Sequence, residues 1–115
     1  MSSDFHKLQS ALKSILKIEY YTKDVTFEEF IDNEEKADAT LIHFVNLGER
    51  LSSLSEGFQK QHEQLPYSES RQMRNFIAHQ YDAIHKVTIW ETIQNELPKL
   101  KNEIQKLLQE INESK

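Results

Sequence analysis

The stretch WETIQNELPKLKNEIQKLLQEI, residues 90–111, decides the fold class of this chain. Its apolar residues recur in alternating steps of three and four positions, which is the pattern of a helix packed in a bundle. The apolar seam consists of Trp90, Ile93, Leu97, Leu100, Ile104, Leu107 and Ile111. We therefore predict a helix over residues 87–112. Pro98 interrupts it, and we expect a bend near Gln94, whose carbonyl would lose its hydrogen-bond partner.

The same helical spacing extends upstream through a chain that holds only two Gly and two Pro residues. It predicts helices over residues 4–21, 34–54 and 68–80, with a short acidic helix over 26–30 and Asp4 as the first N-cap. Residues 55–67 are expected to form a connection with one helical turn, and residues 82–86 a break. The apolar face of the first helix consists of Phe5, Leu8, Leu12, Ile15 and Leu16. The short helix would turn Phe27 and Phe30 inward. The second long helix would bury Ala37, Leu41, Phe44, Val45, Gly48 and Leu51. We predict an all-α, four- to five-helix up-and-down bundle.

Composition sets further bounds. At 115 residues the chain is expected to be one helical domain, 1–115. It has no cysteine, so disulfides, thiolate nucleophiles and Cys-based zinc sites are excluded. No signal-peptide pattern and no apolar run of roughly 20 residues occurs. We therefore expect a cytoplasmic protein with no membrane partner.

The net charge of −5 is unevenly distributed. Residues 24–64 carry ten acidic against three basic residues, a net charge of −7, whereas residues 65–90 carry a net charge of +1. The overall acidity argues against broad, tight, non-specific nucleic-acid binding, which relies on many phosphate contacts. The acidic residues nevertheless lie away from the segment that carries the candidate chemistry.

That segment is Arg74-Asn75-Phe76-Ile77-Ala78-His79-Gln80-Tyr81. Arginine binds phosphate in bidentate fashion, and histidine exchanges a proton near neutral pH. A phosphate-binding cation beside a proton carrier is what phosphodiester cleavage without a metal requires. We predict Arg74 and His79 as catalytic residues and Asn75 and Tyr81 as substrate-binding residues.

A helical projection at 100° per residue tests this prediction. It places Met73, Phe76 and Ile77 on the core face, Asn75 and His79 on the opposite side, and Arg74 and Tyr81 at the border. The alternatives are a solvated surface His79–Arg74 pair and a Tyr81 that serves only in packing. No histidine has partners at metal-ligand spacing, so we expect no metal and no cofactor.

Two residues of the second long helix bear on the same site. Gly48 costs about 1 kcal/mol relative to Ala within a helix, so we expect it to mark a close helix–helix approach. Glu49 is either a solvated charge, which is the preferred interpretation, or a carboxylate that orients Arg74.

The chain resembles the HepT-type ribonuclease toxins of the HEPN superfamily. The resemblance rests on Arg74-Asn75, His79-x-Tyr81, Gly48-Glu49 and on the segments 24–30 and 97–100, which occur in the family's order. The chain departs from the family at two places. Arg50 follows Gly-Glu, where a small residue is common, and residues 67–71, just before the motif, lack the Trp that many relatives have there.

The resemblance implies a HEPN-like helical homodimer with the two motif grooves near the two-fold axis, which agrees with His79 facing away from its own core. It also implies metal-independent RNA cleavage by the toxin of a type II toxin–antitoxin pair. The partner would be a minimal nucleotidyltransferase antitoxin that silences the toxin by AMPylation of Tyr81.

Two other functions remain open. One is a non-catalytic module that binds a nucleotide or presents substrate to a nucleotidyltransferase, and it predicts nucleotide affinity without turnover. The other is a helical dimer that acts only in protein–protein interaction, and it predicts neither nucleotide affinity nor turnover.

Overall fold

The computed structural model describes the backbone of residues 2–79 and 83–113 and the side chains of residues 3–77 and 86–112. These described residues form helices and contain no strand, which confirms the predicted all-α class. The elements are α1 (Ser2–Thr22), α2 (Phe27–Asp32), α3 (Glu34–Ser52), α4 (Glu56–Gln61), α5 (Tyr67–His79), α6 (Ala83–Glu91), the π-helix η1 (Thr92–Glu96) and α7 (Leu97–Glu113).

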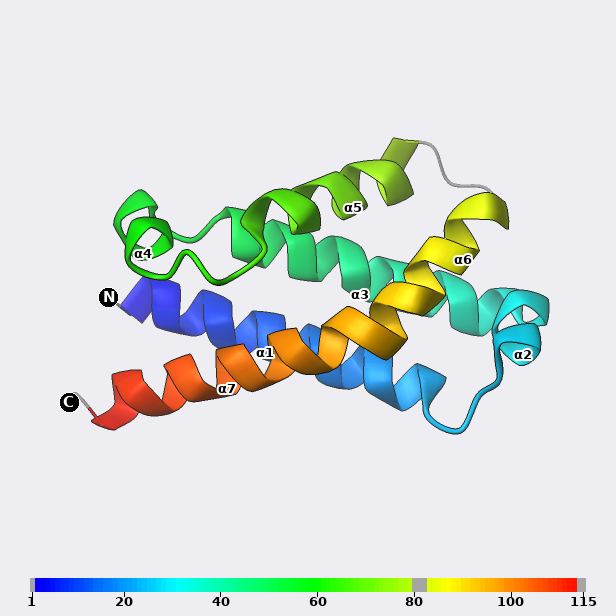
Figure 1. Ribbon diagram of the computed structural model, residues 1–115, viewed down its shortest axis with the longest axis horizontal. Helices are drawn as coiled ribbons and strands as arrows, with labels where there is room; N and C mark the ends of the chain where they lie inside the picture. The colour runs from blue at the N-terminus through cyan, green and yellow to red at the C-terminus, as the bar shows by residue number, and fades with distance from the viewer. Residues whose placement is uncertain (1, 80–82, 114–115) are drawn as a thin grey trace.

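The long segments run up and down, as predicted (Figure 1). α3 packs against α1 on one side and α5 on the other, and α7 packs against α1. The predicted four or five helices are too few, because α4 is a separate helix and the last segment is divided by η1. α5 is covered mainly by α3, so one of its flanks stays open toward α7.

The core lies between α1, α3 and the α6–α7 segment. Its seam on the last segment matches the prediction, because Ile93, Leu97, Leu100, Ile104 and Leu107 are buried and Trp90 and Ile111 pack against them. α3 buries the predicted residues except Val45, which is half-buried. The largest core side chains that are fully buried include Phe30, Leu8, Ile15, Ile18, Leu51, Ile89 and Ile104.

α1 differs from the prediction in two details. It begins at Ser2, so Asp4 lies in its first turn and is not the N-cap. It buries Leu8, Ala11, Ile15 and Ile18, whereas Leu16 is 46% exposed. The buried face of α1 is the one that α3 and α7 cover together, and Leu16 falls beyond its edge.

α2 is the predicted acidic helix, and it is fixed at both ends. Thr26 and Glu29 form a capping box, in which each side chain accepts a hydrogen bond from the backbone N–H of the other at 3.2 and 3.0 Å. Phe30 is buried and Phe27 is half-buried, and both rings pack against Trp90. The prediction that these two side chains turn inward is confirmed.

The predicted break at residues 82–86 is wrong for residues 83–86, which already belong to α6. No Gly or Pro occurs there to end a helix. The predicted irregularity ahead of Pro98 is present as η1, in which the Leu97 N–H donates to the Thr92 carbonyl, five residues earlier. The proline ring clashes with a carbonyl four residues before it and offers no N–H, and a wider turn relieves both problems.

α4 is tied to the start of α1. Asp4 accepts two hydrogen bonds from Ser55, from the backbone N–H at 2.9 Å and from the hydroxyl at 2.7 Å. Ser55 is in turn the N-cap of α4, where its Oγ accepts from the Phe58 N–H. Burial alone would raise the pKa of Asp4, but the two hydrogen bonds from Ser55 and the charge of Lys7 outweigh it and lower that pKa.

No helix among the described residues combines the length and the apolar character needed to cross a bilayer.

Candidate functional site

Gly48 sets the distance between α3 and α5. A Cβ at Gly48 would lie 2.8 Å from the Ser70 carbonyl oxygen and 2.9 Å from the Cβ of Arg74. Both distances are shorter than real contacts allow, so a side chain at this position would push the two helix backbones apart. The predicted close approach is confirmed, and it brings the base of Arg74 directly against α3.

The Arg74 guanidinium is fixed by two polar neighbours. Its Nη1 lies 3.6 Å from Oε1 of Glu49, and its Nε and Nη2 donate to Oδ1 of Asn75 at 3.3 and 3.2 Å. The Arg74 side chain is 25% exposed and that of Glu49 is 54% exposed. The cation is therefore held at the border between core and solvent, where the helical projection placed it.

The ion pair decides between the two interpretations of Glu49. The preferred one, a solvated charge without a partner, is wrong, because Glu49 reaches across to Arg74 from the neighbouring helix. An exposed ion pair of this kind contributes little stability, about 0–1 kcal/mol. Its effect is mainly geometric, since it limits the directions in which Arg74 can point.

The other side chains of α5 follow the predicted faces with one exception. Met73 and Ile77 pack against the core, and Asn75 is exposed on the opposite side. Phe76 was predicted on the core face but is 44% exposed. α5 has α3 as its main neighbour among the described residues, and the part of its apolar face that turns away from α3 is more exposed.

The remaining site residues cannot be placed in the same way. His79 is the last residue of α5, five positions after Arg74, but its side chain lies outside the described residues. Tyr81 and the side chain of Ala78 lie outside them as well. The catalytic pair of Arg74 and His79 and the role of Tyr81 therefore stay predictions.

A groove of about 620 Å³ opens on the other flank of α5, between that helix and the η1–α7 segment. Its apolar wall includes Phe44, Leu47, Leu65, Pro66, Met73, Leu97 and Leu100. Glu69, Glu96 and Glu103 contribute carboxylates to its lining, against one cation, Lys99. This negative balance is unfavourable for a phosphate, so the groove and the Arg74 flank differ in chemistry. The apolar periodicity of the sequence could not predict the groove, because it forms where α5 and α7 pack little against each other.

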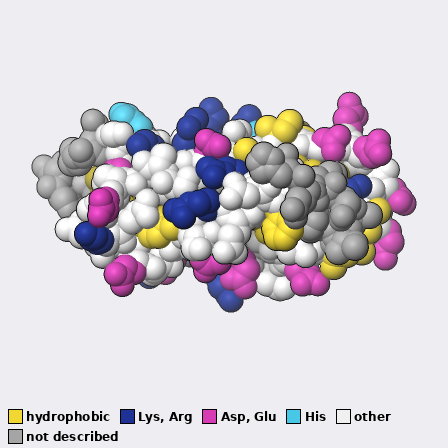
Figure 2. Space-filling model, turned by 90° about the horizontal axis from the view of Figure 1, so that it is seen from above, with side chains coloured by type: hydrophobic (Ala, Val, Ile, Leu, Met, Phe, Trp, Pro, Cys, Tyr) yellow, Lys and Arg dark blue, Asp and Glu magenta, His cyan; other side chains and the backbone are white. Residues whose placement is uncertain are grey.

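The charged side chains are segregated on the face that carries α5. Figure 2 shows Lys and Arg side chains gathered across the middle of this face and most acidic ones toward its ends.

Within residues 3–77 and 86–112, no group of three or more His, Asp or Glu side chains is arranged to hold a metal ion. At the Arg74 flank the described residues supply a cation whose direction is fixed by Glu49 and Asn75.

Comparison with known proteins is consistent with that chemistry. The family described as "Ribonuclease HepT-like" matches residues 11–107. The chain is 32% identical over 108 residues to a Methanocaldococcus jannaschii protein named "Gamma-glutamylcyclotransferase and putative RNase", with 94% of this chain and 49% of that protein covered. It therefore spans about half the length of that relative.

Two further relatives are matched over most of both chains. One is a Methanocaldococcus jannaschii protein named "Putative RNase", 30% identical over 93 residues, with 81% of this chain and 80% of that protein covered. The other is a Thermococcus cleftensis protein named "Probable ribonuclease HepT", 26% identical over 100 residues, with coverage of 87% and 91%. No solved structure matches at a significant level.

Proposed function

The chain belongs to the HepT-like ribonuclease family, and from that premise we propose that it is an endoribonuclease that cleaves RNA with Arg74 and His79. The observation that carries the proposal is the placement of Arg74. Gly48 brings its backbone against α3, and Glu49 and Asn75 hold its guanidinium at the surface. A cation that is oriented before substrate arrives can stabilise developing phosphorane charge without further reorganisation.

The reaction is transesterification without a metal. The RNA 2′-oxygen attacks the adjacent phosphorus, the bond from phosphorus to the 5′-oxygen breaks, and the products are a 2′,3′-cyclic phosphate and a 5′-hydroxyl. His79 accepts the proton of the 2′-hydroxyl or donates one to the leaving 5′-oxygen. In a dimer with the two sites near the two-fold axis, the two copies of His79 would divide these roles.

The other two residues act on the substrate. Asn75 already accepts hydrogen bonds from Arg74, so its amide group can position that cation or the phosphate bound to it. Tyr81 would position the RNA by hydrogen bonding or by stacking on a base.

The first experiment replaces the predicted catalytic residues. His79→Ala should lower the rate of RNA cleavage by roughly 10²–10⁴-fold, the usual range for a general acid–base residue. Arg74→Ala should lose a comparable factor, and Arg74→Lys should recover part of it, because lysine keeps the charge but loses the bidentate fork. His6→Ala, a replacement of an exposed histidine in α1, is the matched control.

Thermal stability should be unchanged in His79→Ala, and cleavage by the wild type should persist in EDTA. Full activity of His79→Ala, or loss of wild-type activity in EDTA, would exclude this mechanism. Nucleotide binding without any turnover would favour the non-catalytic module instead.

The cellular role that we propose is that of a cytoplasmic toxin controlled by a nucleotidyltransferase antitoxin. AMP attached to the Tyr81 hydroxyl would bring a phosphodiester and an adenosine to the site. That phosphate would compete with the RNA phosphate for Arg74, and the adenosine would block access to the site.

Mass spectrometry tests the regulation. Co-expression with the antitoxin and ATP should add one or more AMP masses to the intact protein, and Tyr81→Phe should escape the modification. Tyr67→Phe is the matched control, since the Tyr67 hydroxyl is engaged with the His62 carbonyl at 2.7 Å. An adduct on another residue, or inhibition with Tyr81 unmodified, would favour silencing by complex formation alone.

A further inference from the structure

We propose that a strip of basic and aromatic side chains guides single-stranded RNA from α1 across α3 to the Arg74 flank of α5. The basic strip consists of Arg71 on α5, Arg50 on α3 and Lys13 and Lys17 on α1, together with the rings of Tyr20, Tyr21 and His43. The inference rests on the proposed function for the identity of the ligand, and it adds the path by which the ligand reaches the site.

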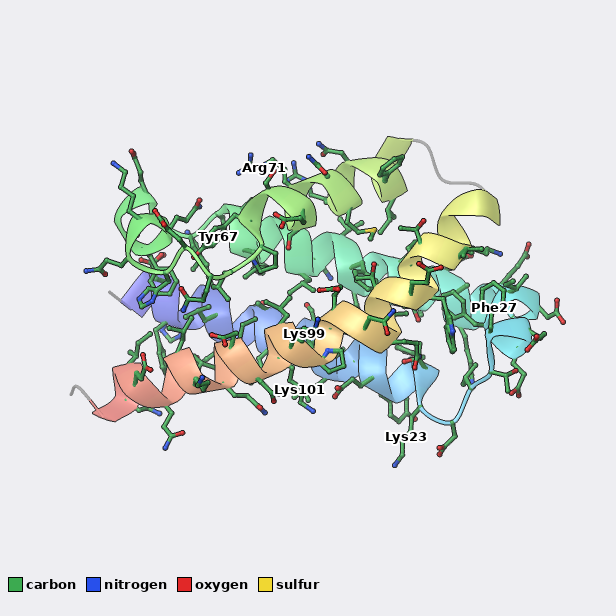
Figure 3. The ribbon with its side chains drawn as sticks, in the orientation of Figure 1. Lys23, Phe27, Tyr67, Arg71, Lys99 and Lys101 are labelled. Carbon is green, nitrogen blue, oxygen red and sulfur yellow. The ribbon has the colours of Figure 1, made fainter. Side chains whose placement is uncertain are left out.

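The strip begins where α5 meets α3. Arg71 lies one turn before Arg74, on the edge of α5 that faces away from α7 (Figure 3). Glu49 of α3 pairs with Arg74, and the next residue, Arg50, reaches in the opposite direction. Arg50 Nε donates to Oγ of Ser10 on α1 at 3.0 Å, so its guanidinium bridges the surface between α3 and α1.

The strip continues along α1 toward its C-terminal end. Tyr21 of α1 stacks on His43 of α3, with ring centroids 5.9 Å apart and an interplanar angle of 19°. Burial lowers the pKa of His43, and the positive charge of Lys17 lowers it further. Lys17 lies four residues before Tyr21 on α1, so the two side chains share one face of that helix. Tyr20 packs edge-on against Tyr21 and is 78% exposed.

Two carboxylates on the helices of the strip, those of Glu49 and Glu19, are already paired with other cations. The four cationic residues of the strip are all exposed. Glu49 is engaged by Arg74, and Glu19 on α1 turns toward α7, where its carboxylate meets Lys101 at 2.9 Å. The Lys and Arg side chains that Figure 2 shows across the middle of the molecule agree with a local excess of positive charge. An acidic protein can therefore still bind a polyanion, provided that contact is confined to this strip.

The dimensions and the exposed ring favour a single strand. Adjacent packed helices lie about 8–10 Å apart, so the distance from α5 across α3 to α1 is about 20 Å, which about six stacked nucleotides span at ~3.4 Å each. A duplex hides its bases, whereas a single strand offers each base to an aromatic ring such as Tyr20. Lysine and arginine would follow the phosphates of the same strand.

The test measures binding of a mixed-sequence 12-nucleotide 2′-O-methyl RNA, which lacks the attacking 2′-hydroxyl and stays intact. Lys13→Gln/Lys17→Gln should weaken binding about 25-fold at 0.1 M salt, and the slope of log Kd against log salt should fall by about 1.4, or about 0.7 for each lost phosphate contact. Lys60→Gln/Lys106→Gln is the matched control and should change neither quantity, because these exposed lysines lie on α4 and α7.

Tyr20→Ala separates stacking from charge. It should weaken binding about tenfold, as the loss of one stacked base does, and leave the salt slope unchanged. Equal weakening by the strip pair and the control pair would overturn the proposal, since net charge alone would then explain the effect. Unchanged binding in the strip variants would also overturn it and would assign this surface to another partner, such as an acidic protein.

Cleavage of the same sequence as unmodified RNA distinguishes this proposal from the proposed function. The strip variants should raise KM and leave kcat unchanged, whereas His79→Ala should lower kcat and keep the affinity for the 2′-O-methyl strand. If the wild type cleaves no RNA but the strip variants bind RNA more weakly, the proposed catalytic mechanism is wrong and the proposed RNA path along the strip is retained. If cleavage depends on His79 but the strip variants bind RNA as the wild type does, the proposed RNA path is wrong and the proposed catalytic mechanism is retained.

Discussion

At the scale of single residues, Gly48 has the widest effect on the candidate site. Its missing Cβ lets the Ser70 carbonyl and the Arg74 Cβ occupy the space that a side chain would need. The nearest atoms include backbone, which cannot move aside by rotating about a side-chain bond. Any larger residue must therefore shift α5 as a whole, and Arg74 and the end of the helix would shift with it.

Gly48→Ala should accordingly destabilise the protein by about 1–3 kcal/mol, the usual cost of overpacking, although alanine is the better helix former. Cleavage should fall as well, because Arg74 moves. Gly57→Ala is the matched control, since a Cβ there meets nothing within 4 Å, and it should stabilise by up to about 1 kcal/mol. Denaturant unfolding of both variants measures the difference, and equal stabilisation by both would refute the close approach.

The position of single side chains relative to the core was predicted correctly where it depended only on the face of one helix. Gly48, Met73 and Ile77 were placed correctly for that reason. The prediction was wrong where burial depended on which other helices cover that face, as for the exposed Leu16 and Phe76. Glu49 was misjudged for a related reason, because its partner comes from another helix.

At the scale of elements, α4 depends on a carboxylate from a distant part of the chain. A six-residue helix is too short to be stable alone, and the Asp4–Ser55 hydrogen bonds fix its first turn to α1. The lowered pKa of Asp4 means that the folded state favours its charged form. Its contribution to stability is therefore complete above the ordinary carboxyl pKa of about 4 and is lost as the pH falls through the lowered value.

Asp4→Asn should cost about 1 kcal/mol at neutral pH, since the carboxylate is only partly buried. The difference from the wild type should shrink below about pH 4. Ser55→Ala should converge only in part, because its hydroxyl also caps α4 by accepting from the Phe58 N–H at every pH. Ser52→Ala should show no such pH dependence, because the Ser52 hydroxyl only donates to the nearby Glu49 carbonyl. Chemical unfolding between pH 3 and 7 provides the measurement, and a gap that stays constant with pH would contradict the role of the charge.

Helix existence and order were predictable from apolar periodicity, but the form of the last segment was not. Pro98 indicated the position of an irregularity near Gln94, and the structure has η1 there. Periodicity alone could not show that the chain would widen one turn and continue. The predicted break is wrong for residues 83–86, because this stretch includes Ala83 and Ile84 and no Gly or Pro, and the turns that follow it are buried at Ile89 and Ile93.

At the scale of the whole molecule, the assembly remains a prediction. The protein should sediment as a homodimer at micromolar concentration, with the two α5 helices near the symmetry axis. Ala78→Arg should weaken the dimer and abolish cleavage together, because both depend on the surface around His79. Gln105→Arg, at an exposed position on α7, adds the same charge as a control away from α5 and should sediment like the wild type. A monomer that retains full activity would contradict the shared site.

The separation of charge described above also gives the basic strip a direction. The acidic side chains of α2 and of the first turn of α3 lie at one end of a body 46 Å long, on the side where α1 ends, and Arg71 lies farther from that end (Figure 3). A polyanion that diffuses toward the acidic end is repelled, and one that approaches the strip is attracted. At an ionic strength of about 0.1 M the screening length is about 10 Å, so each region acts on an approaching strand almost independently. Under the proposed function, RNA that approaches the strip would therefore be favoured over RNA that approaches the acidic end before any contact forms.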